Sequence, residues 1–441
     1  MTPLVPSFFV KKSIIKKGMI YVIDINRIRN NKKEIELALL KRMDNVNLDT
    51  LLKWDKEKRE IGTYTDELRA RKRKTSEKIA ELKKENKQAD ALIAEMTELG
   101  KKIEEYTTKY NELDKKEDDY LAYLPNIPDD DIPAGGKENN MVIKEYLQKP
   151  AFNYNLIPHF EILKRYKMVD YDRGIKIAGE KSWIYTGLGA RLEWALINYF
   201  VDTHIKNGYT FTMLPYVLNY ECGYGAGQFP KFKDEVYTVG NTNKFLLPTA
   251  ETALVNLHSN EILNESELPK KYFAYTQCFR VEAGSSRVEE RGTIRGHQFN
   301  KVEMVQYVKE DKTEEAFNEL LNIAEGLMKK LGLHYRVSKL AAADCAQAMC
   351  RTYDIEVWIP SMNKYIEVSS VSNSRDYQAR RNHTKYRDTN GKTHYVCTLN
   401  ASGLATSRLL PAIVEQFQNE DGSITIPEVL RPYLDGIDII K

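Results

Sequence analysis

The sequence predicts an α+β protein in which a long antiparallel pair of helices precedes a larger domain of helices and antiparallel strands. Two observations lead to this prediction. Between residues 51 and 124, apolar side chains recur at spacings of four and three, which is the seam pattern of a coiled coil. From residue 188 onward, helical stretches alternate with runs in which apolar and polar residues take turns, as in half-buried strands. The chain has 441 residues, enough for two or more domains.

The composition is typical of a globular protein: 29% of the residues are charged and 42% are hydrophobic. No apolar run approaches the ~20 residues that a membrane span requires, so no membrane partner is predicted. The formal net charge of +3 is too small to indicate nucleic-acid binding by itself, and the distribution of charge must decide that question.

The five cysteines are odd in number and show no repeated spacing. This usage predicts reduced thiols and a cytoplasmic location. No Cys-x-x-Cys pair or Cys/His cluster is present, so no zinc site is expected.

Residues 1–18 differ in character from the rest of the chain, with four lysines and no acidic residue. They are interpreted either as a targeting segment or as an extension that is disordered or follows from a start assigned too early. The second interpretation is preferred, because the apolar stretch is short and arginine is absent.

The amino-terminal arm is expected at about 51–124. A polar stretch from Lys83 to Asp90 interrupts the seam and predicts a reversal of direction. Two helices of ~35 residues would then form an antiparallel arm ~50 Å long. Pro125 and Pro128 should end the second helix.

Charge is divided unevenly along this arm. Residues 51–84 carry twelve basic and seven acidic side chains, a net of +5, whereas 89–124 carry five and ten, a net of −5. Cross-helix pairing explains much of this difference. Cross-helix pairing does not explain one run of basic residues. Several side chains of this run must face solvent together, and they could bind phosphate backbones. The run consists of Arg69, Arg71, Lys72, Arg73 and Lys74.

The stretch 279–305 predicts two strands around a polar, glycine-bearing loop. Four arginines, Arg280, Arg287, Arg291 and Arg295, fall at this hairpin. Guanidinium groups grip phosphate oxygens through paired N–H bonds and stack on rings, so the set suits a polyphosphate attached to a flat base. A surface hairpin with solvated arginines is the alternative.

The hairpin also resembles a known motif. Its Phe-Arg, Glu-Ala-Gly-Ser and Arg-Gly-x-x-Arg-x-His-Gln-Phe-x-Lys-Val-Glu are similar to motif 2 of the seryl-tRNA synthetases, which are class II aminoacyl-tRNA synthetases. The helix at 188–205 and a strand expected at 209–218 through Pro215 resemble motif 1. Residues 249–251 resemble the family's Thr-Ala-Glu loop, and 398–408 resemble motif 3. The resemblance covers about residues 19–441.

This resemblance implies a class II antiparallel sheet flanked by helices, and three regions after the extension: a tRNA-binding domain at 19–125, a linker at 126–145 and a catalytic domain at 146–441. It implies ATP- and Mg²⁺-dependent activation of L-serine to seryl-adenylate and transfer to tRNA(Ser), by a homodimer. Whether tRNA(Sec) is also charged is left open. The alternative is a synthetase-like paralogue that activates an amino acid for a carrier protein or a small molecule.

By resemblance, the catalytic residues are Arg280, Arg408 and Glu367. Serine binding is expected at Thr249, Ala250, Glu251, Arg280, Glu303, Asn400 and Ser402. ATP binding is expected at Arg280, Val281, Glu282, Arg295, Gly296, Phe299, Glu367, Val368, Ser369, Ser370 and Arg408. Magnesium is expected at Glu367 and Ser370, and tRNA at the basic run of the arm.

Glu303 is the best candidate for reading the serine hydroxyl, because a pocket cannot exclude the smaller alanine by size and must use a polar partner instead. Glu303 could also be a structural carboxylate paired with a hairpin arginine. The sequence departs from the family pattern in the motif 2 loop at 286–289, at Ala401 and at Ser407.

Overall fold

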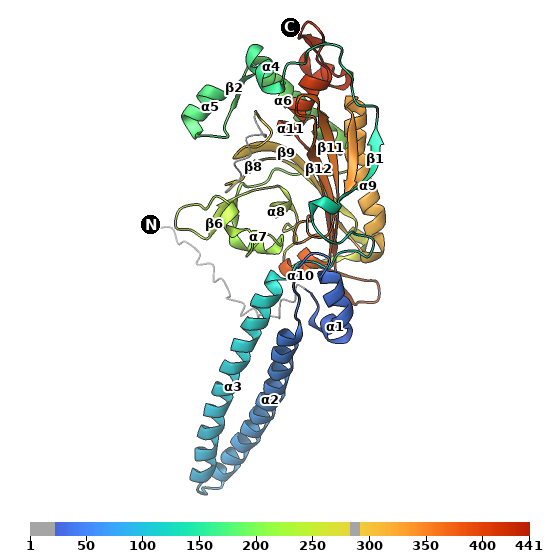
Figure 1. Cartoon of the computed structure of the whole chain (residues 1–441). Helices are drawn as coiled ribbons and strands as arrows, with labels where there is room; N and C mark the ends of the chain where they lie inside the picture. Colours follow the sequence, from blue (N-terminus) through green and yellow to red (C-terminus); the bar gives the residue numbers. More distant parts are fainter. Residues whose placement is uncertain (1–22, 283–291) are drawn as a thin grey trace, which may run out of the picture. The chain divides into compact units, whose positions relative to one another are not determined.

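The computed structural model describes residues 23–282 and 292–441 (Figure 1). The extension at 1–18 and the loop residues Arg287 and Arg291 lie outside the described part. The described chain divides into two compact units. The first spans Asp49–Leu121, and the second combines residues 23–48 with Ala122–Lys441.

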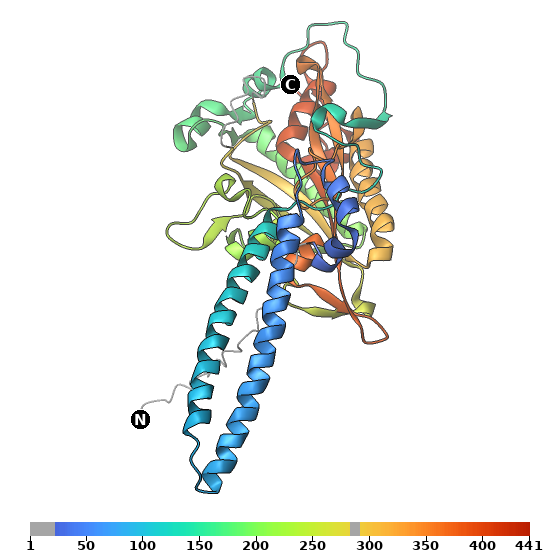
Figure 2. The same ribbon diagram turned by 60° about the horizontal axis from the view of Figure 1, so that its bottom comes forward.

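The first unit is a pair of long helices, as predicted. Helix α2 runs from Asp49 to Lys84 and α3 from Asp90 to Tyr123, side by side in both Figure 1 and Figure 2. Their contacts are antiparallel: Trp54 packs edge-on against Tyr120, with ring centroids 6.1 Å apart, and Arg71 pairs with Glu95. The reversal falls within the polar stretch expected to contain it.

The seam of this pair is not wholly apolar. Lys58 and Glu117 interrupt the hydrophobic spacing in the two helices, and in the structure they form a buried ion pair with each other. Asp114 also lies 3.1 Å from the Lys58 ammonium. A buried charge pair at one position disfavours other registers of the two helices, which would leave both charges unpaired.

The second unit is built on an eight-stranded sheet whose neighbours are antiparallel, except for the parallel pair β4–β8. Antiparallel order follows from the short connections of the central hairpins. The strands, in spatial order, are β1 (Met141–Tyr146), β10 (Tyr335–Lys339), β11 (Arg351–Ile359), β12 (Lys364–Arg375), β15 (Cys397–Ala405), β9 (Gln298–Val308), β8 (Lys270–Phe279) and β4 (Thr210–Phe211).

One face of this sheet is apolar and packs against three helices, α6 (Gly187–Lys206), α9 (Thr313–Leu331) and α11 (Thr406–Gln416). Val371, Ala401 and Met304 point to this side and belong to the main hydrophobic core. Because strand side chains alternate, their neighbours in sequence point to the opposite face, which is polar.

The remaining elements surround the sheet. Helix α8 follows the loop at Thr249 and packs on β8 and β9, while α7 packs on α10. These elements are α1 (Ile25–Leu39), α4 (His159–Arg165), α5 (Tyr171–Ala178), α7 (Tyr220–Gly225), α8 (Glu251–Leu254), α10 (Tyr377–Asn382), β2 (Val169–Asp170), β3 (Ile184–Tyr185), β5 (Val217–Asn219), β6 (Lys244–Leu246), β7 (Ile262–Asn264), β13 (Lys385–Arg387), β14 (Thr393–Tyr395), β16 (Ile424–Thr425) and β17 (Ile439–Ile440).

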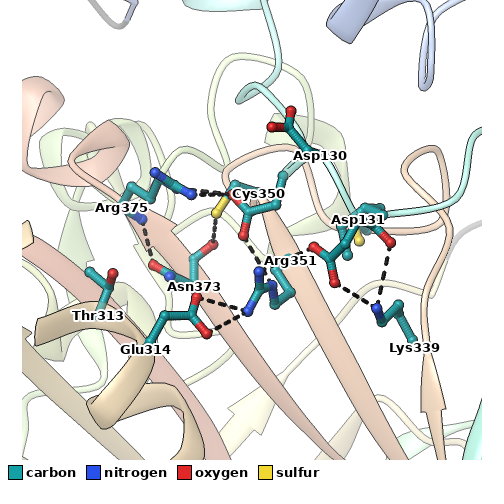
Figure 3. A network of polar contacts seen from close by, with 12 residues as sticks. Asp130, Asp131, Thr313, Glu314, Lys339, Cys350, Arg351, Asn373 and Arg375 are labelled. Atoms are coloured by element: carbon teal, nitrogen blue, oxygen red, sulfur yellow. Dashed lines mark hydrogen bonds and ion pairs between the residues drawn. The ribbon is translucent and has the colours of Figure 1, made fainter. Parts of the chain in front are cut away.

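The segment 126–145, whose composition suggests a linker, is bound tightly to the second unit. Asp129 pairs with Arg375 at 2.6 Å and with Arg351 at 3.0 Å. Figure 3 shows Arg351, Lys339 and Asp131 of the same network. Arg351 and Lys339 also hold Asp131. The segment then continues into β1, the edge strand of the sheet. Proline, glycine and aspartate mark irregular backbone, but they do not indicate whether that backbone is held by its side chains.

Two strand expectations also differ in detail. The expected strand through Pro215 is two short strands, β4 and β5, in different sheets with Pro215 between them. Proline has no N–H to donate to a ladder, and the chain changes sheets there. Strand β9, expected to be half-buried, is buried on both faces from Lys301 to Val308.

In the part of the chain that the structure describes, no helix is long and apolar enough to cross a membrane. Nor do the described residues contain a group of three or more His, Cys, Asp or Glu side chains arranged to hold a metal ion. All five cysteines are free thiols.

Candidate active site

The polar face of the sheet gathers most of the predicted site residues. Residues directly opposite each other on paired antiparallel strands point to the same face, so their register fixes which side chains meet. Four adjoining strands contribute a continuous polar row through the pairs Glu303–Ser402, Asn400–Ser372, Thr352–Ser372 and Asp354–Ser370.

Glu303 lies at the centre of a compact buried cluster. One carboxylate oxygen accepts a hydrogen bond from the Thr249 hydroxyl at 2.5 Å and another from the Glu251 backbone N–H at 2.8 Å. The other oxygen lies 2.8 Å from the Lys301 ammonium. Burial alone would raise the pKa of Glu303, but the charge of Lys301 and these hydrogen bonds hold it below its ordinary value. The predicted alternative partner was an arginine; the structure provides a lysine.

The pKa of Glu251 shifts in the opposite direction from that of Glu303. Burial, followed by the neighbouring charge of Glu303, raises its pKa to about 7, although a hydrogen bond from Gln378 to its carboxylate at 2.6 Å works against this. A carboxyl group whose pKa is raised in this way gains negative charge when a cation binds beside it. The site thus offers one firmly ionised and one adaptable carboxylate.

The motif 2 hairpin places an arginine over an aromatic ring. The Arg280 guanidinium lies 5.1 Å from the centre of the Phe299 ring and also donates to the Pro248 carbonyl. Glu282 pairs with Arg295 at 2.6 Å. Glu282 adopts a positive φ of 50°, which turns the chain at the end of β8 toward the loop.

A pocket of about 400 Å³ adjoins this row. Arg295 and Arg408, two of the predicted phosphate residues, line it together with the predicted magnesium residues Glu367 and Ser370, while Phe299 lines a second pocket. Arg408 pairs with Glu367 at 3.2 Å. Asp354 also lines the pocket, and burial followed by the charge of Glu367 raises its pKa well above its ordinary value.

Other predicted residues are placed less directly. Ala250 and Val368 are fully buried. The Ser369 hydroxyl donates to the Ser402 carbonyl and ties β12 to β15. Val281 N–H donates to the Glu235 carbonyl. A side chain at Gly296 would meet the Trp183 ring, so glycine is required there.

The departures from the family pattern can also be located. Ala401 points into the core and is fully buried, away from the polar face. The Ser407 carbonyl accepts a hydrogen bond from Thr293 at 2.7 Å, which joins the exit of the motif 2 loop to α11. The departures at 286–289 lie outside the described residues.

Three residues of the site were not predicted from the sequence: Lys301, Gln378 and Asp354. Lys301 lies on the same strand as Glu303, two residues earlier, and this spacing does place both side chains on one face. Gln378 and Asp354 reach the site from elements far away in sequence, and no local pattern marks them.

In the first unit, the predicted tRNA-binding run lies on α2. Arg69, Arg71, Arg73 and Lys74 are exposed and Lys72 is half-buried. Arg69 pairs with Asp66 and Arg71 with Glu95. Among the described residues, no acidic side chain forms an ion pair with Arg73 or Lys74, so these two remain the most available cations of the run.

Comparison with known proteins agrees with this architecture. Residues 22–128 match the seryl-tRNA synthetase N-terminal domain, and residues 232–417 match the tRNA synthetase class II core domain (G, H, P, S and T). The chain is 54% identical over 420 residues to a protein of Clostridium acetobutylicum named serine–tRNA ligase 2, an alignment that covers 94% of this chain and 99% of that one.

Solved structures give the same result. The crystal structure of seryl-tRNA synthetase from Pyrococcus horikoshii complexed with ATP is 33% identical, with a TM-score of 0.89 over 95% of this chain and 99% of that one. A cytoplasmic serine–tRNA ligase from Naegleria fowleri in complex with AMP is 25% identical, with a TM-score of 0.85 over 96% and 98% of the two chains. The fold, the polar sheet face and this similarity along nearly the whole chain together place the protein in the seryl-tRNA synthetase family of class II aminoacyl-tRNA synthetases.

Proposed function

We propose that this chain activates L-serine with ATP and transfers the seryl group to the 3′ end of tRNA(Ser). The observation that carries the proposal is the juxtaposition of two sites on one sheet face. A small polar cluster around Thr249, Glu251 and Glu303 suits an amino acid, and the adjoining pocket with Arg295 and Arg408 suits a polyphosphate.

In the amino-acid site, Glu251 is assigned to the α-ammonium of serine, since an adaptable carboxylate gains its charge when a cation binds. The Thr249 hydroxyl is assigned to the same ammonium group. Glu303, with Ser402 opposite it on β15 and Asn400 two residues before Ser402 on the same strand, is assigned to the polar end that receives the serine hydroxyl. Alanine has no hydroxyl to donate to this polar end and forgoes the hydrogen bond that serine makes there, which is the basis for rejecting it.

In the nucleotide site, Phe299 is assigned to stack on adenine, with Glu282 accepting from the adenine amino group. Arg280, which interacts electrostatically with Glu251 of the amino-acid cluster, would hold the α-phosphate. A serine carboxylate oxygen then attacks the α-phosphorus in line, the bond to the bridging oxygen breaks, and pyrophosphate leaves toward Arg295 and Arg408. Such a displacement requires positioning and charge neutralisation, without a dedicated nucleophile on the protein.

Glu367 and Ser370 are assigned to hold Mg²⁺ when ATP binds. Their donor set fits, because Mg²⁺ is bound through one or two carboxylates together with water and substrate phosphates. The buried Asp354 has one carboxylate oxygen without a hydrogen-bond partner among the described residues, and it lines the same pocket. Bound magnesium would neutralise phosphate charge; Arg408, released from Glu367, would take up the γ-phosphate.

In the second step, the terminal ribose hydroxyl of the tRNA attacks the seryl carbonyl and AMP leaves. The basic run on α2 is assigned to the tRNA backbone, with Arg73 and Lys74 as its principal contacts. Such contacts recognise the shape and charge of RNA more than its sequence.

We also propose a homodimer formed through α6, β4 and β5. Five large apolar side chains among the described residues are exposed along this stretch, and β4 is an end strand of the main sheet. They are Trp194, Ile205, Phe211, Met213 and Val217. Light scattering should give twice the mass of one chain at micromolar concentration; a mass of one chain would reject this part of the proposal.

The main test is ATP–pyrophosphate exchange across the twenty amino acids, followed by charging assays. Serine alone should stimulate exchange strongly, and tRNA(Ser) should accept the seryl group. Carrier proteins and tRNA(Sec) serve as additional acceptors in the same assay. Exchange with serine but loading of a carrier protein in place of tRNA(Ser) would favour the paralogue hypothesis.

A further inference from the structure

Lys301 is a buried lysine inside the amino-acid site. Its residue is only 6% exposed, and its ammonium lies 2.8 Å from Glu303 and also donates to the Thr249 hydroxyl. Burying an ammonium group is costly unless a carboxylate pairs with it. Without the Lys301 ammonium, the Glu303 carboxylate would face the substrate as an unbalanced negative charge.

The contacts of Glu303 show what Lys301 does to the pocket. The two Glu303 oxygens accept from Lys301, the Thr249 hydroxyl and the Glu251 N–H, and the charge of Glu303 is balanced at contact distance by Lys301. A carboxylate balanced in this way can still accept a hydrogen bond from a hydroxyl. It attracts a cation far less, because the cation also meets the like charge of Lys301.

The other ionisable groups around the pair are Glu251, Arg280 and Cys278, all of which interact electrostatically with the cluster. Cys278 is a buried thiol whose pKa is raised by burial, so it adds no charge. Arg280 is a second cation. The local balance thus favours a neutral group at the substrate side chain.

We propose that Lys301 is a specificity-determining residue that neutralises Glu303, so that the pocket accepts a side-chain hydroxyl and rejects a side-chain ammonium of similar size. This rests on the proposed function, in which Glu303 faces the serine side chain. The amino acid that the lysine excludes is of the L-2,3-diaminopropionate type, which has an ammonium group where serine has its hydroxyl. Lys301 acts through Glu303 and is a positioning residue, not a catalytic one.

The test is Lys301→Gln, which keeps a hydrogen-bond donor and removes the charge. Pyrophosphate exchange is measured at one fixed pH with serine, alanine and L-2,3-diaminopropionate, for the wild type and the variant. The ratio of kcat/KM for diaminopropionate to that for serine should rise by about 10²-fold, since like-charge juxtaposition costs several kcal/mol and is relieved. Alanine, which has neither group, reports general damage to the site.

The matched control is the double variant Lys301→Gln/Glu303→Gln, which removes both charges. Its ratio should return to within a few fold of the wild-type value, because no carboxylate remains to attract the ammonium. A merely structural lysine would lower all three activities together and leave the ratio unchanged. Lys301→Met, which has a similar length and no polar end, repeats the measurement if the glutamine variant fails to fold.

An unchanged ratio in a folded single variant, or a raised ratio that persists in the double variant, would overturn the proposal. Serine-dependent exchange by the wild type distinguishes failure of the Lys301 proposal from failure of the proposed function. Serine-dependent exchange in the wild type with an unchanged ratio in the variants rejects only the role of Lys301. Absence of serine-dependent exchange in the wild type rejects the proposed function itself.

Discussion

Among the described residues, each unit contains a buried lysine–glutamate pair, and the two glutamates differ in how many hydrogen bonds they accept. In the arm, Lys58 and Glu117 meet across the helical seam, and one Glu117 oxygen is buried without a hydrogen-bond partner among the described residues. In the catalytic unit, both oxygens of Glu303 have donors.

The consequence appears in the ionisation of the two carboxylates. Burial raises the pKa of Glu117 above its ordinary value despite the neighbouring Lys58. Glu303 is more fully hydrogen-bonded, and its pKa is lowered although burial opposes this. A lysine partner does not by itself keep a buried carboxylate charged; at Glu303 the Lys301 charge and hydrogen bond, with the further donors Thr249 and Glu251 N–H, outweigh burial, whereas at Glu117 burial outweighs Lys58. The arm needs a paired charge for register, whereas the active site needs a dependable anion.

Glu303→Ala should have the largest effect. Serine-dependent exchange should fall by ~10⁴-fold or more, because the hydroxyl-reading group is lost and Lys301 is left unpaired. The alanine rate should stay near its low baseline, so the selectivity ratio collapses. Exchange assays with both amino acids check this. Equal loss of both rates would indicate that Glu303 supports the fold or the nucleotide instead.

The arm should affect only the tRNA step. Arg73→Ala/Lys74→Ala should weaken tRNA charging, with a slope of log K against log salt that is smaller by ~0.7–0.9 per lost phosphate contact. Serine-dependent exchange should be unchanged. Lys101→Ala, an exposed cation on α3, is the matched control. An equal loss in that control would point to general electrostatics and not to the basic run.

The buried pair of the arm can be broken or replaced. Glu117→Ala removes the closest carboxylate of Lys58, although Asp114 remains 3.1 Å from the ammonium, and should destabilise the chain by up to about 3–5 kcal/mol, the range for breaking a buried pair. Lys58→Met/Glu117→Leu removes both charges and should be close to neutral. Urea unfolding measures both. A double variant as unstable as Glu117→Ala would show that the pair stabilises the arm beyond its packing.

The smallest effect concerns Asp118, beside this pair. Burial, followed by the charge of Asp114, raises its pKa to about 7. A carboxyl whose folded-state pKa is raised binds more protons when folded, so its stabilising contribution is complete below its unfolded pKa and is lost as the pH rises toward 7. Asp118→Asn should therefore flatten the fall in melting temperature between pH 4 and 7. An unchanged pH profile would contradict the assignment.

Sequence reasoning recognised neither of these two pairs. Lys58 and Glu117 each appeared as an irregularity in an apolar seam, and only the pairing of the two helices brings residues 59 positions apart into contact. Lys301 and Glu303 were visible on one strand, but the third member, Thr249, arrives from another element. Helices, hairpins and motif residues follow local patterns. Partners across elements do not, because packing alone selects them.

The same limit explains the segment at 126–145. Its composition correctly marks irregular backbone, yet Asn126 donates to the carbonyls of Ala348 and Ser374, and Arg42 donates to four carbonyls of the same region, including that of Asn126. These contacts join segments that are distant in sequence. A deletion of the arm should therefore not extend beyond Leu121, because the residues that follow belong to the second unit.

The central claim is that one unit performs the chemistry and the other binds the tRNA. Its most direct test replaces residues 63–109 with a short glycine turn, which joins the helices near Gly62 and Tyr110, where they touch, and keeps the Trp54–Tyr120 and Lys58–Glu117 contacts. This variant should retain serine-dependent pyrophosphate exchange within a few fold of the wild type and lose tRNA charging. Loss of both activities in a folded variant, or charging that survives the deletion, would contradict the claim.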